Sequence, residues 1–194
     1  MPSSTPKPRE SLADLFPEIA AEWHPTKNDG LFPEDVSKGS NRKIWWKCSL
    51  ADDHEWVASP HARTGSKSGC LCCRGYIASV TNSLASLFPE VSAQWHPDKN
   101  GDLTPDEVVA GSGVKYWWKC PVAEDHEWRA VTDSRTRGKR GCPFCRGVKV
   151  SGTNRLSTNF PVVSAQWHPD KNGDLTPDQV ALGSGRKVWW KCDE

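Results

Sequence analysis

The sequence has no long apolar run and few residues from which to build a large core. Hydrophobic residues make up 36% of its 194 residues, and the mean hydropathy is -0.66. No stretch is long enough to span a membrane, and the polar, proline-rich residues 2–10 do not read as a signal peptide. We therefore expect a cytoplasmic protein of small modules, each of which needs disulfides or a bound metal for stability. A disordered leader over residues 1–10 precedes them.

The sequence also lacks the patterns of common enzyme sites. It has no Ser-His-Asp arrangement and no glycine-rich loop of the kind that cradles phosphate. Glu55 and Glu127 each follow a histidine directly, but their strand-like neighbours predict exposed side chains. We expect no enzymatic activity.

What the sequence does have is an internal repeat with a constant spacing of 72 residues. A constant period indicates one structural unit copied in tandem. We predict zinc module 1 over residues 11–79, zinc module 2 over 80–151, and a truncated third module over 152–194 that lacks its later zinc ligands. The repeat is carried by Trp-His-Pro at 23–25, 95–97 and 167–169, and by Trp-Trp-Lys-Cys at 45–48, 117–120 and 189–192.

Within a copy, the pattern predicts a small α+β module with a β-hairpin, a zinc knuckle and short helices. Apolar residues at spacings of three and four predict a helix from Ser11, which Pro17 divides in two. In the second copy, Thr104 begins a capped turn, and the segments 115–120 and 127–131 predict two strands.

Each complete copy carries a set of cysteines and one histidine with the spacing of metal ligands. The pattern is Cys-x5-His, fifteen further residues, and then Cys-x2-Cys. Four nitrogen and sulfur donors form a closed, structural zinc site, so we predict two structural Zn²⁺ ions. The predicted ligands are Cys48, His54, Cys70 and Cys73 in the first copy, and Cys120, His126, Cys142 and Cys145 in the second.

Other cysteines and histidines are left outside these sites. Cys72 corresponds to Phe144 in the second copy and is predicted to be a spare thiol, while Cys192 begins a third site without its partners. The recurring histidines precede proline, and each complete copy already has four donors without them, so we expect them to be surface or packing residues; they are His24, His96 and His168.

These motifs together resemble a known family. The run Ser-Leu-Ala-Ser-Leu-Phe-Pro-Glu over residues 83–90, with Trp-His-Pro, Trp-Trp-Lys-Cys, His-Glu-Trp and Gly-Cys-Pro-Phe-Cys after it, is similar to the bacterial "probable zinc-ribbon domain" family of tandem treble-clef zinc fingers. The resemblance implies a treble-clef-like module with the zinc ligands given above. Relatives often accompany nuclease-like domains, which implies a role with nucleic acid and favours DNA.

Charge is divided within each repeat. Residues 84–114 hold one lysine against five acids, a net charge of -4, whereas residues 115–149 have a net charge of +5. Basic residues close to the knuckle could bind phosphate, and one tryptophan of each Trp-Trp pair should face outward, either to stack on a base or to cover the zinc site. The candidate nucleic-acid contacts are Arg63, Lys67, Arg74, Arg135, Arg137, Lys139, Arg140 and Arg146.

Two functions fit this pattern. The first is nucleic-acid binding by the basic loops beside the knuckles. The alternative is a protein-interaction or spacer array in which the zinc is purely structural, which suits the overall charge of only +1. Strong, salt-sensitive affinity for nucleic acid distinguishes the two.

Overall fold

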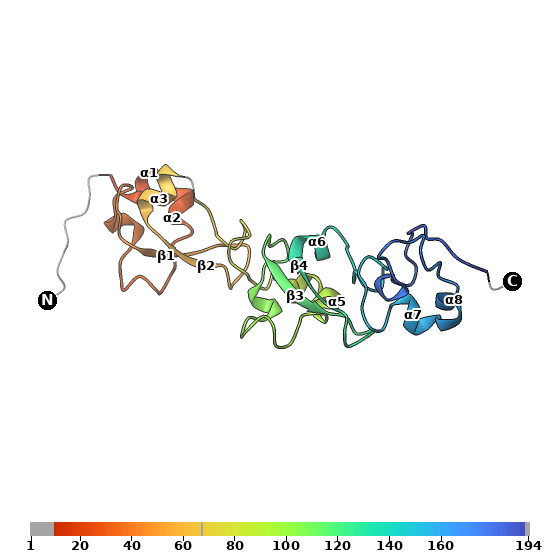
Figure 1. Cartoon of the computed structure of the whole chain (residues 1–194). Coiled ribbons are helices and arrows are strands. Elements are labelled where there is room, and N and C mark those ends of the chain that lie inside the picture. Colours follow the sequence, from red (N-terminus) through yellow and green to blue (C-terminus); the bar gives the residue numbers. More distant parts are fainter. Residues whose placement is uncertain (1–9, 67, 193–194) are drawn as a thin grey trace. The chain divides into compact units, whose positions relative to one another are not determined.

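The computed structural model of the chain describes residues 10–66 and 68–192 (Figure 1). Apart from Glu10, the predicted leader lies outside these residues. The chain divides into two compact units, Met1–Leu87 with Pro105–Val109, and Phe88–Thr104 with Ala110–Glu194. The first unit thus includes part of the second sequence copy, and the module boundaries drawn from the sequence stay a prediction.

Each copy begins with two short helices that meet at a Phe-Pro step. Ser11 caps the first helix, because its hydroxyl accepts from the Asp14 N–H at 3.2 Å and the Asp14 carboxylate accepts from the Ser11 N–H at 3.1 Å. Pro17 occupies the first turn of the second helix, so the predicted division is confirmed. These helices are α1 (Leu12–Leu15) and α2 (Pro17–Ala20), α4 (Leu84–Leu87) and α5 (Pro89–Ser92), and α7 (Leu156–Asn159) and α8 (Pro161–Ala165).

A two-stranded antiparallel sheet follows in the first two copies. It consists of β1 (Ile44–Lys47) with β2 (Glu55–Ala58), and of β3 (Lys115–Lys119) with β4 (Glu127–Val131), as the sequence predicts. Trp46 lies opposite Trp56, and Trp118 lies opposite Trp128, so two indole rings share the inner face of each hairpin. Trp46 and Trp118 are fully buried.

The Trp-His-Pro segment packs against the edge of this hairpin. Trp23 forms an isolated bridge to Trp46, and the N–H of Lys47 donates to the carbonyl oxygen of Glu22 at 2.7 Å. The rings of Trp23 and Trp46 meet edge to face, with centroids 5.4 Å apart. Equivalent tryptophan bridges form in the other two copies, which explains why the two tryptophan motifs recur together.

A short helix after the hairpin was not predicted from the sequence. It is α3 (Pro60–Gly65) in the first copy and α6 (Thr132–Thr136) in the second. Ser59 caps α3 by accepting from the Ala62 N–H at 3.2 Å, with Pro60 in its first turn. These helices contain Arg63 and Arg135, which the sequence analysis had assigned to basic loops.

The remaining regular elements are single 3-10 turns in the acidic part of each copy. They are η1 (Pro33–Asp35), η2 (Pro105–Glu107) and η3 (Pro177–Gln179). The second lies where the sequence predicts a capped turn after Thr104, and the first begins after Phe32 in place of a threonine. In the third copy, Trp167 and Trp190 still pack edge to face at 5.4 Å. Trp190 is nevertheless 43% exposed, since no strand corresponding to β2 or β4 covers it among the described residues.

Candidate zinc centres

The four predicted ligands of the first copy converge at one point. Cys48 directly follows β1, His54 directly precedes β2, and the two remaining cysteines lie in the turn after α3. The sulfur of Cys48 is 3.7 Å from that of Cys73, and the Nδ1 atom of His54 is 3.7 Å from the Cys70 sulfur and 3.4 Å from the Cys73 sulfur. All four donor atoms lie within 4.8 Å of one another.

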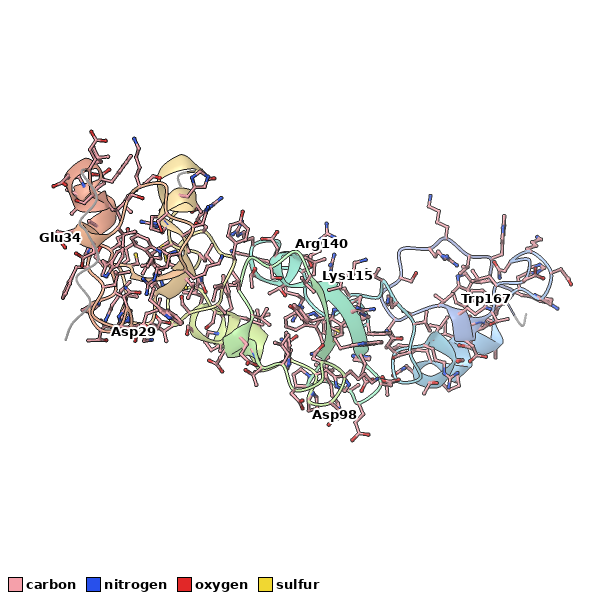
Figure 2. The ribbon with its side chains drawn as sticks, turned by 90° about the vertical axis from the view of Figure 1, so that its left-hand side faces the viewer. Asp29, Glu34, Asp98, Lys115, Arg140 and Trp167 are labelled. Carbon is pink, nitrogen blue, oxygen red and sulfur yellow. The ribbon has the colours of Figure 1, made fainter. Side chains whose placement is uncertain are left out.

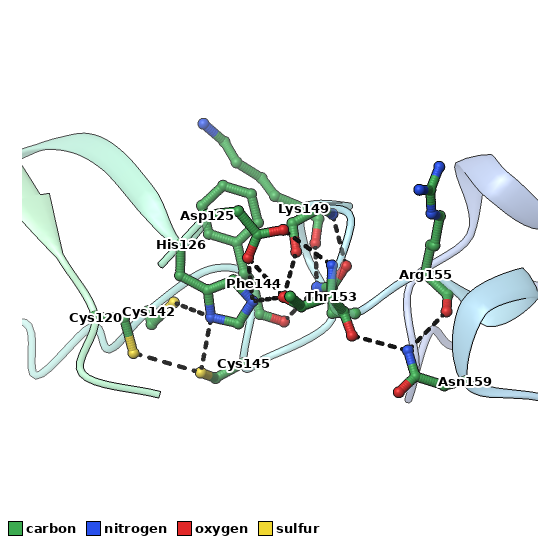
Figure 3. A network of polar contacts seen from close by, with 12 residues as sticks. Cys120, Asp125, His126, Cys142, Phe144, Cys145, Lys149, Thr153, Arg155 and Asn159 are labelled. Atoms are coloured by element: carbon green, nitrogen blue, oxygen red, sulfur yellow. Dashed lines mark hydrogen bonds and ion pairs between the residues drawn. The ribbon is translucent and has the colours of Figure 1, made fainter. Parts of the chain in front are cut away.

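The second copy repeats this geometry closely (Figure 3). The sulfurs of Cys120 and Cys145 are 3.6 Å apart, and the Nδ1 atom of His126 is 3.7 Å from the Cys142 sulfur and 3.5 Å from the Cys145 sulfur. The hairpin brings the first cysteine next to the histidine, and the two-residue gap of the knuckle places both later sulfurs beside them.

These separations fit a tetrahedral zinc ion. Zn–S bonds of about 2.3 Å and a Zn–N bond of about 2.0 Å at tetrahedral angles place sulfurs about 3.8 Å apart and sulfur and nitrogen about 3.5 Å apart. The observed separations of 3.4–3.7 Å lie close to both values. Each site can therefore hold one zinc ion with four protein donors. Such a site binds the ion without leaving a coordination position for substrate.

The charge of the cluster also favours a cation. Loss of hydration, and then the neighbouring sulfurs of Cys70 and Cys48, raises the pKa of Cys73 to about 12. Loss of hydration and the sulfurs of Cys120 and Cys142 likewise raise the pKa of Cys145 to about 12. Three thiolates held this close repel one another, and a divalent ion between them removes that repulsion.

The two unassigned cysteines lie outside these clusters. Cys72 is buried and is not among the four converging donors, and burial raises the pKa of its thiol to about 11. Its counterpart Phe144 stacks on the ring of His126, with centroids 5.0 Å apart. Cys192 is exposed, and no metal-binding group among the described residues includes it.

The histidine of each Trp-His-Pro motif makes a separate network that the sequence analysis did not find. His24 is buried; its Nδ1 atom accepts from the N–H groups of Thr26 and Lys27, and its Nε2 atom lies 2.9 Å from the Glu55 carboxylate. Lys27 also binds Glu55, and the hydrogen bonds from Lys27 and then His24 lower the pKa of Glu55 to about 2. The second copy repeats the network at the same positions.

This network corrects one expectation and supports another. Glu55 and Glu127 were expected to be exposed, but their side chains are 24% and 25% exposed and bind histidine and lysine. The recurring histidine has its own partners, in agreement with its exclusion from the zinc ligands. The sequence does contain an indication of this network, because its histidine, lysine and glutamate recur at the 72-residue spacing in the copies that contain them.

Two of the candidate nucleic-acid contacts are buried. Arg63 and Arg135 are each 5% exposed, so they are not free to contact phosphate. The guanidinium of Arg63 lies over the rings of Trp46 and Trp56, at 4.8 Å and 5.2 Å from their centroids. Arg135 lies 5.0 Å from both indole centroids of the second hairpin. These two arginines cover the tryptophan pairs, which removes them from the candidate contacts.

The other basic candidates lie at the surface where the structure describes them. Arg137 is paired with Asp133 at 3.2 Å, and Arg74 lies over the ring of Tyr76 at 5.1 Å. Lys67 lies outside the described residues. Lys139, Arg140 and Arg146 are exposed. Figure 2 shows Lys115 and Arg140 on the side of their unit away from Asp98.

A hairpin, short helices and a closed Cys3His cluster together define a small zinc-binding module, present twice in full. A family model described as "Probable Treble clef zinc finger domain" matches residues 19–76, 91–148 and 163–194. The matches cover most of the chain, and the chain belongs to this family. Their starting points differ by the same 72 residues as the sequence motifs.

A search of curated proteins found no match. In the part of the chain that the structure describes, no helix has the length and apolar character needed to cross a membrane.

Proposed function

We propose that the chain is a nucleic-acid-binding protein, and that zinc module 2 carries most of the binding surface. The observation that supports this most directly is a pocket of about 390 Å³ beside the second knuckle, lined by residues of β4, α6 and the knuckle turns. Four exposed cationic side chains border it and no carboxylate does; they are Arg129, Arg140, Arg146 and Lys149.

The lining of this basic pocket suits a base or sugar as well as a phosphate. Trp128, Pro143 and Val148 are among the lining residues and provide apolar surface. On the outer face of the hairpin, Arg129 also lies 5.9 Å from the ring of Trp117, which Lys99 approaches at 4.9 Å. Cations around a flat aromatic ring are typical of surfaces that bind nucleic acid without strong sequence preference. The family resemblance favours DNA.

The same surface in zinc module 1 has a different character. At the positions of Arg129, Arg140 and Lys149, the first copy has Val57, Ser68 and Ile77. Only the arginine of the knuckle, Arg74, is kept, and Val57, Tyr76 and Ile77 are exposed there. The first copy thus provides neutral residues that this fold already accommodates at the basic positions.

This difference supplies a sharp test. The triple variant Arg129→Val, Arg140→Ser, Lys149→Ile gives module 2 the residues of module 1 and should keep both zinc ions. A second variant removes three charges elsewhere, by serine substitution of the exposed Lys38, Arg42 and Lys43. Binding of the zinc-loaded proteins to labelled duplex and single-stranded DNA and RNA would be followed by fluorescence anisotropy over a salt series.

We expect the pocket variant to lose most of its affinity and the control variant to keep it. Each phosphate contact contributes about 0.9 to the slope of log K against log salt on duplex DNA, so the pocket variant should lower that slope by roughly 2 to 3. Equal losses in the two variants would show only a general charge effect and would contradict the proposed surface. If the zinc-loaded protein binds no nucleic acid at low salt, the protein-interaction role favoured by the apolar surface of module 1 takes its place.

A further inference from the structure

Each zinc-binding histidine has a second nitrogen, and the segment that leads into the next copy contacts it. The Nε2 atom of His54 lies 2.7 Å from the hydroxyl of Thr81 and 3.1 Å from that of Ser79. In the second copy, the Nε2 atom of His126 lies 3.2 Å from the hydroxyl of Thr153. Because Nδ1 faces the sulfurs, a neutral ligand imidazole carries its proton on Nε2, and this N–H donates to the threonine.

The residue before each ligand histidine contacts the same segment. The Asp125 carboxylate accepts from the Thr153 N–H at 2.9 Å and from the Thr153 hydroxyl at 2.6 Å (Figure 3). The hydroxyl therefore accepts from His126 and donates to Asp125. In the first copy, Asp53 accepts from the Val80 N–H at 2.7 Å. The segment is thus bound both to the ligand and to its neighbour in the chain.

An asparagine then fixes the same segment to the knuckle. The side-chain oxygen of Asn154 accepts from the Ser151 N–H at 2.7 Å, and its amide donates to the carbonyl oxygens of Phe144 and Lys149, both at 2.8 Å. Asn82 makes the corresponding three bonds in the first copy. The pattern Ser-x-Thr-Asn at 79–82 and 151–154 is therefore a repeated structural device.

This device ends where the front of the next copy begins. The N–H of Leu84 donates to the carbonyl oxygen of Val108 at 2.7 Å, and a Cβ atom at Gly75 in the knuckle would lie 3.8 Å from Val109. These residues all belong to the first compact unit, which explains why that unit extends into the second copy.

At the junction between the second and third copies, the knuckle and the front of the next copy approach more closely than at the first junction. The N–H of Leu182 donates to the carbonyl oxygen of Asn154 at 2.8 Å, and a Cβ atom at Gly147 would lie 2.6 Å from the Leu182 oxygen. The knuckle of one copy and the front of the next therefore meet through backbone, with the histidine–threonine bond beside them.

We propose that Thr81 and Thr153 are positioning residues that couple zinc binding in one copy to the ordering of the front of the following copy. The hydroxyl orients the ligand imidazole and holds its proton on Nε2, which favours zinc at Nδ1. In return, the bound ion fixes the histidine, and the histidine fixes the segment on which the next copy docks. Zinc therefore stabilises the junctions of the array in addition to each module.

The first test measures zinc affinity in the full-length protein. The variants are made at Thr153, because His54 has the hydroxyl of Ser79 as well as that of Thr81 within reach. Thr153→Val keeps the shape of the side chain but cannot accept the N–H, Thr153→Ser keeps the acceptor, and Thr26→Val is the control on an exposed threonine away from this site. Zinc transfer to a chromophoric chelator would be followed for all four proteins. Loss of such an outer contact typically weakens metal binding about 10- to 100-fold.

In Thr153→Val we expect one of the two zinc ions to transfer at a chelator concentration at least tenfold lower, and Thr153→Ser and Thr26→Val to match the parent. The cobalt-substituted protein should keep a tetrahedral spectrum in every variant, which separates positioning from unfolding. If both zinc ions of Thr153→Val transfer at the same chelator concentration as those of Thr26→Val, the proposal is wrong. It is equally wrong if Thr153→Ser binds zinc as weakly as Thr153→Val.

The second test follows the junction. Cys70→Ser removes the first zinc site from the otherwise intact chain, and hydrogen exchange would be measured at the amides of Ser83 and Leu84 and at Cys120. We expect protection to be lost at Ser83 and Leu84, whose N–H groups donate to Ser79 and Val108, and to be kept at Cys120 in the second hairpin. Unchanged protection at Ser83 and Leu84 without the first zinc would overturn the coupling.

Discussion

Removing one zinc ligand tests how far each module depends on its metal. Cys142→Ser deletes one of three sulfurs in the second site. A 72-residue unit has a total stability of roughly 4–11 kcal/mol at the usual 0.05–0.15 kcal/mol per residue. Structural zinc contributes an apparent ~10–16 kcal/mol at neutral pH, which equals or exceeds that total. We therefore expect the hairpin, α6 and knuckle of module 2 to unfold in this variant.

Native mass spectrometry and hydrogen exchange provide the assay. The parent should carry two zinc ions and Cys142→Ser one, with protection lost over residues 115–149 and kept in the hairpin of module 1. Cys72→Ala is the matched control, since Cys72 is a buried cysteine outside the four-donor cluster, and it should keep both ions. Loss of both ions from Cys142→Ser would refute independent sites, and persistent protection over 115–149 would refute the view that zinc holds this half together.

Three further predictions concern single substitutions, each measured by native-state hydrogen exchange around the altered position. Trp118→Ala removes a fully buried ring and should cost about 3–5 kcal/mol, whereas Trp190→Ala, at a position 43% exposed, should cost under about 2 kcal/mol. Gly147 has a φ of +69°, and an added Cβ atom would lie only 2.6 Å from the carbonyl oxygen of Leu182. Gly147→Ala should therefore destabilise the third copy by more than the ~1–2 kcal/mol expected for Gly173→Ala, since Gly173 has a φ of +57° but no atom near its Cβ position. Asn154→Ala removes three hydrogen bonds from a buried residue and should cost about 1–3 kcal/mol, confined to the junction with the third copy.

The zinc site was the part of this protein most open to sequence reasoning. Metal ligands must be particular residue types at particular spacings, and two copies with the same spacing separate ligands from other cysteines. Position alone assigned Cys72 to the place of Phe144, and the structure leaves it outside the cluster. The hairpin and the division of the first helix at Pro17 were predictable for a similar reason, since alternation and proline act locally.

The role of the buried arginines was not predictable from charge. Arg135 lies in a basic stretch, which is typical of a solvated loop, and its burial depends on two tryptophans from other elements. The capping signal of Ser59 and Pro60 was available in the first copy and indicates the helix, but it does not say which face of the helix is buried. Long-range packing decides that, and a pattern of charges does not contain it.

Comparison of the two complete copies distinguishes residues that form the module from residues that differ between the modules. The tryptophan pair, the zinc ligands and the Ser-x-Thr-Asn segment are the same in both complete copies, because each is fixed by contacts inside the array. The border of the pocket beside the knuckle is different, with Arg129 and Lys149 where the first copy has Val57 and Ile77. Nothing in the hairpin or the zinc site requires charge at these positions, since the first copy folds in the same way without it. The nucleic-acid ligand that we propose for module 2 would account for this charge. Module 1, with its exposed apolar residues at the same place, would then contact a different part of that ligand or a different partner.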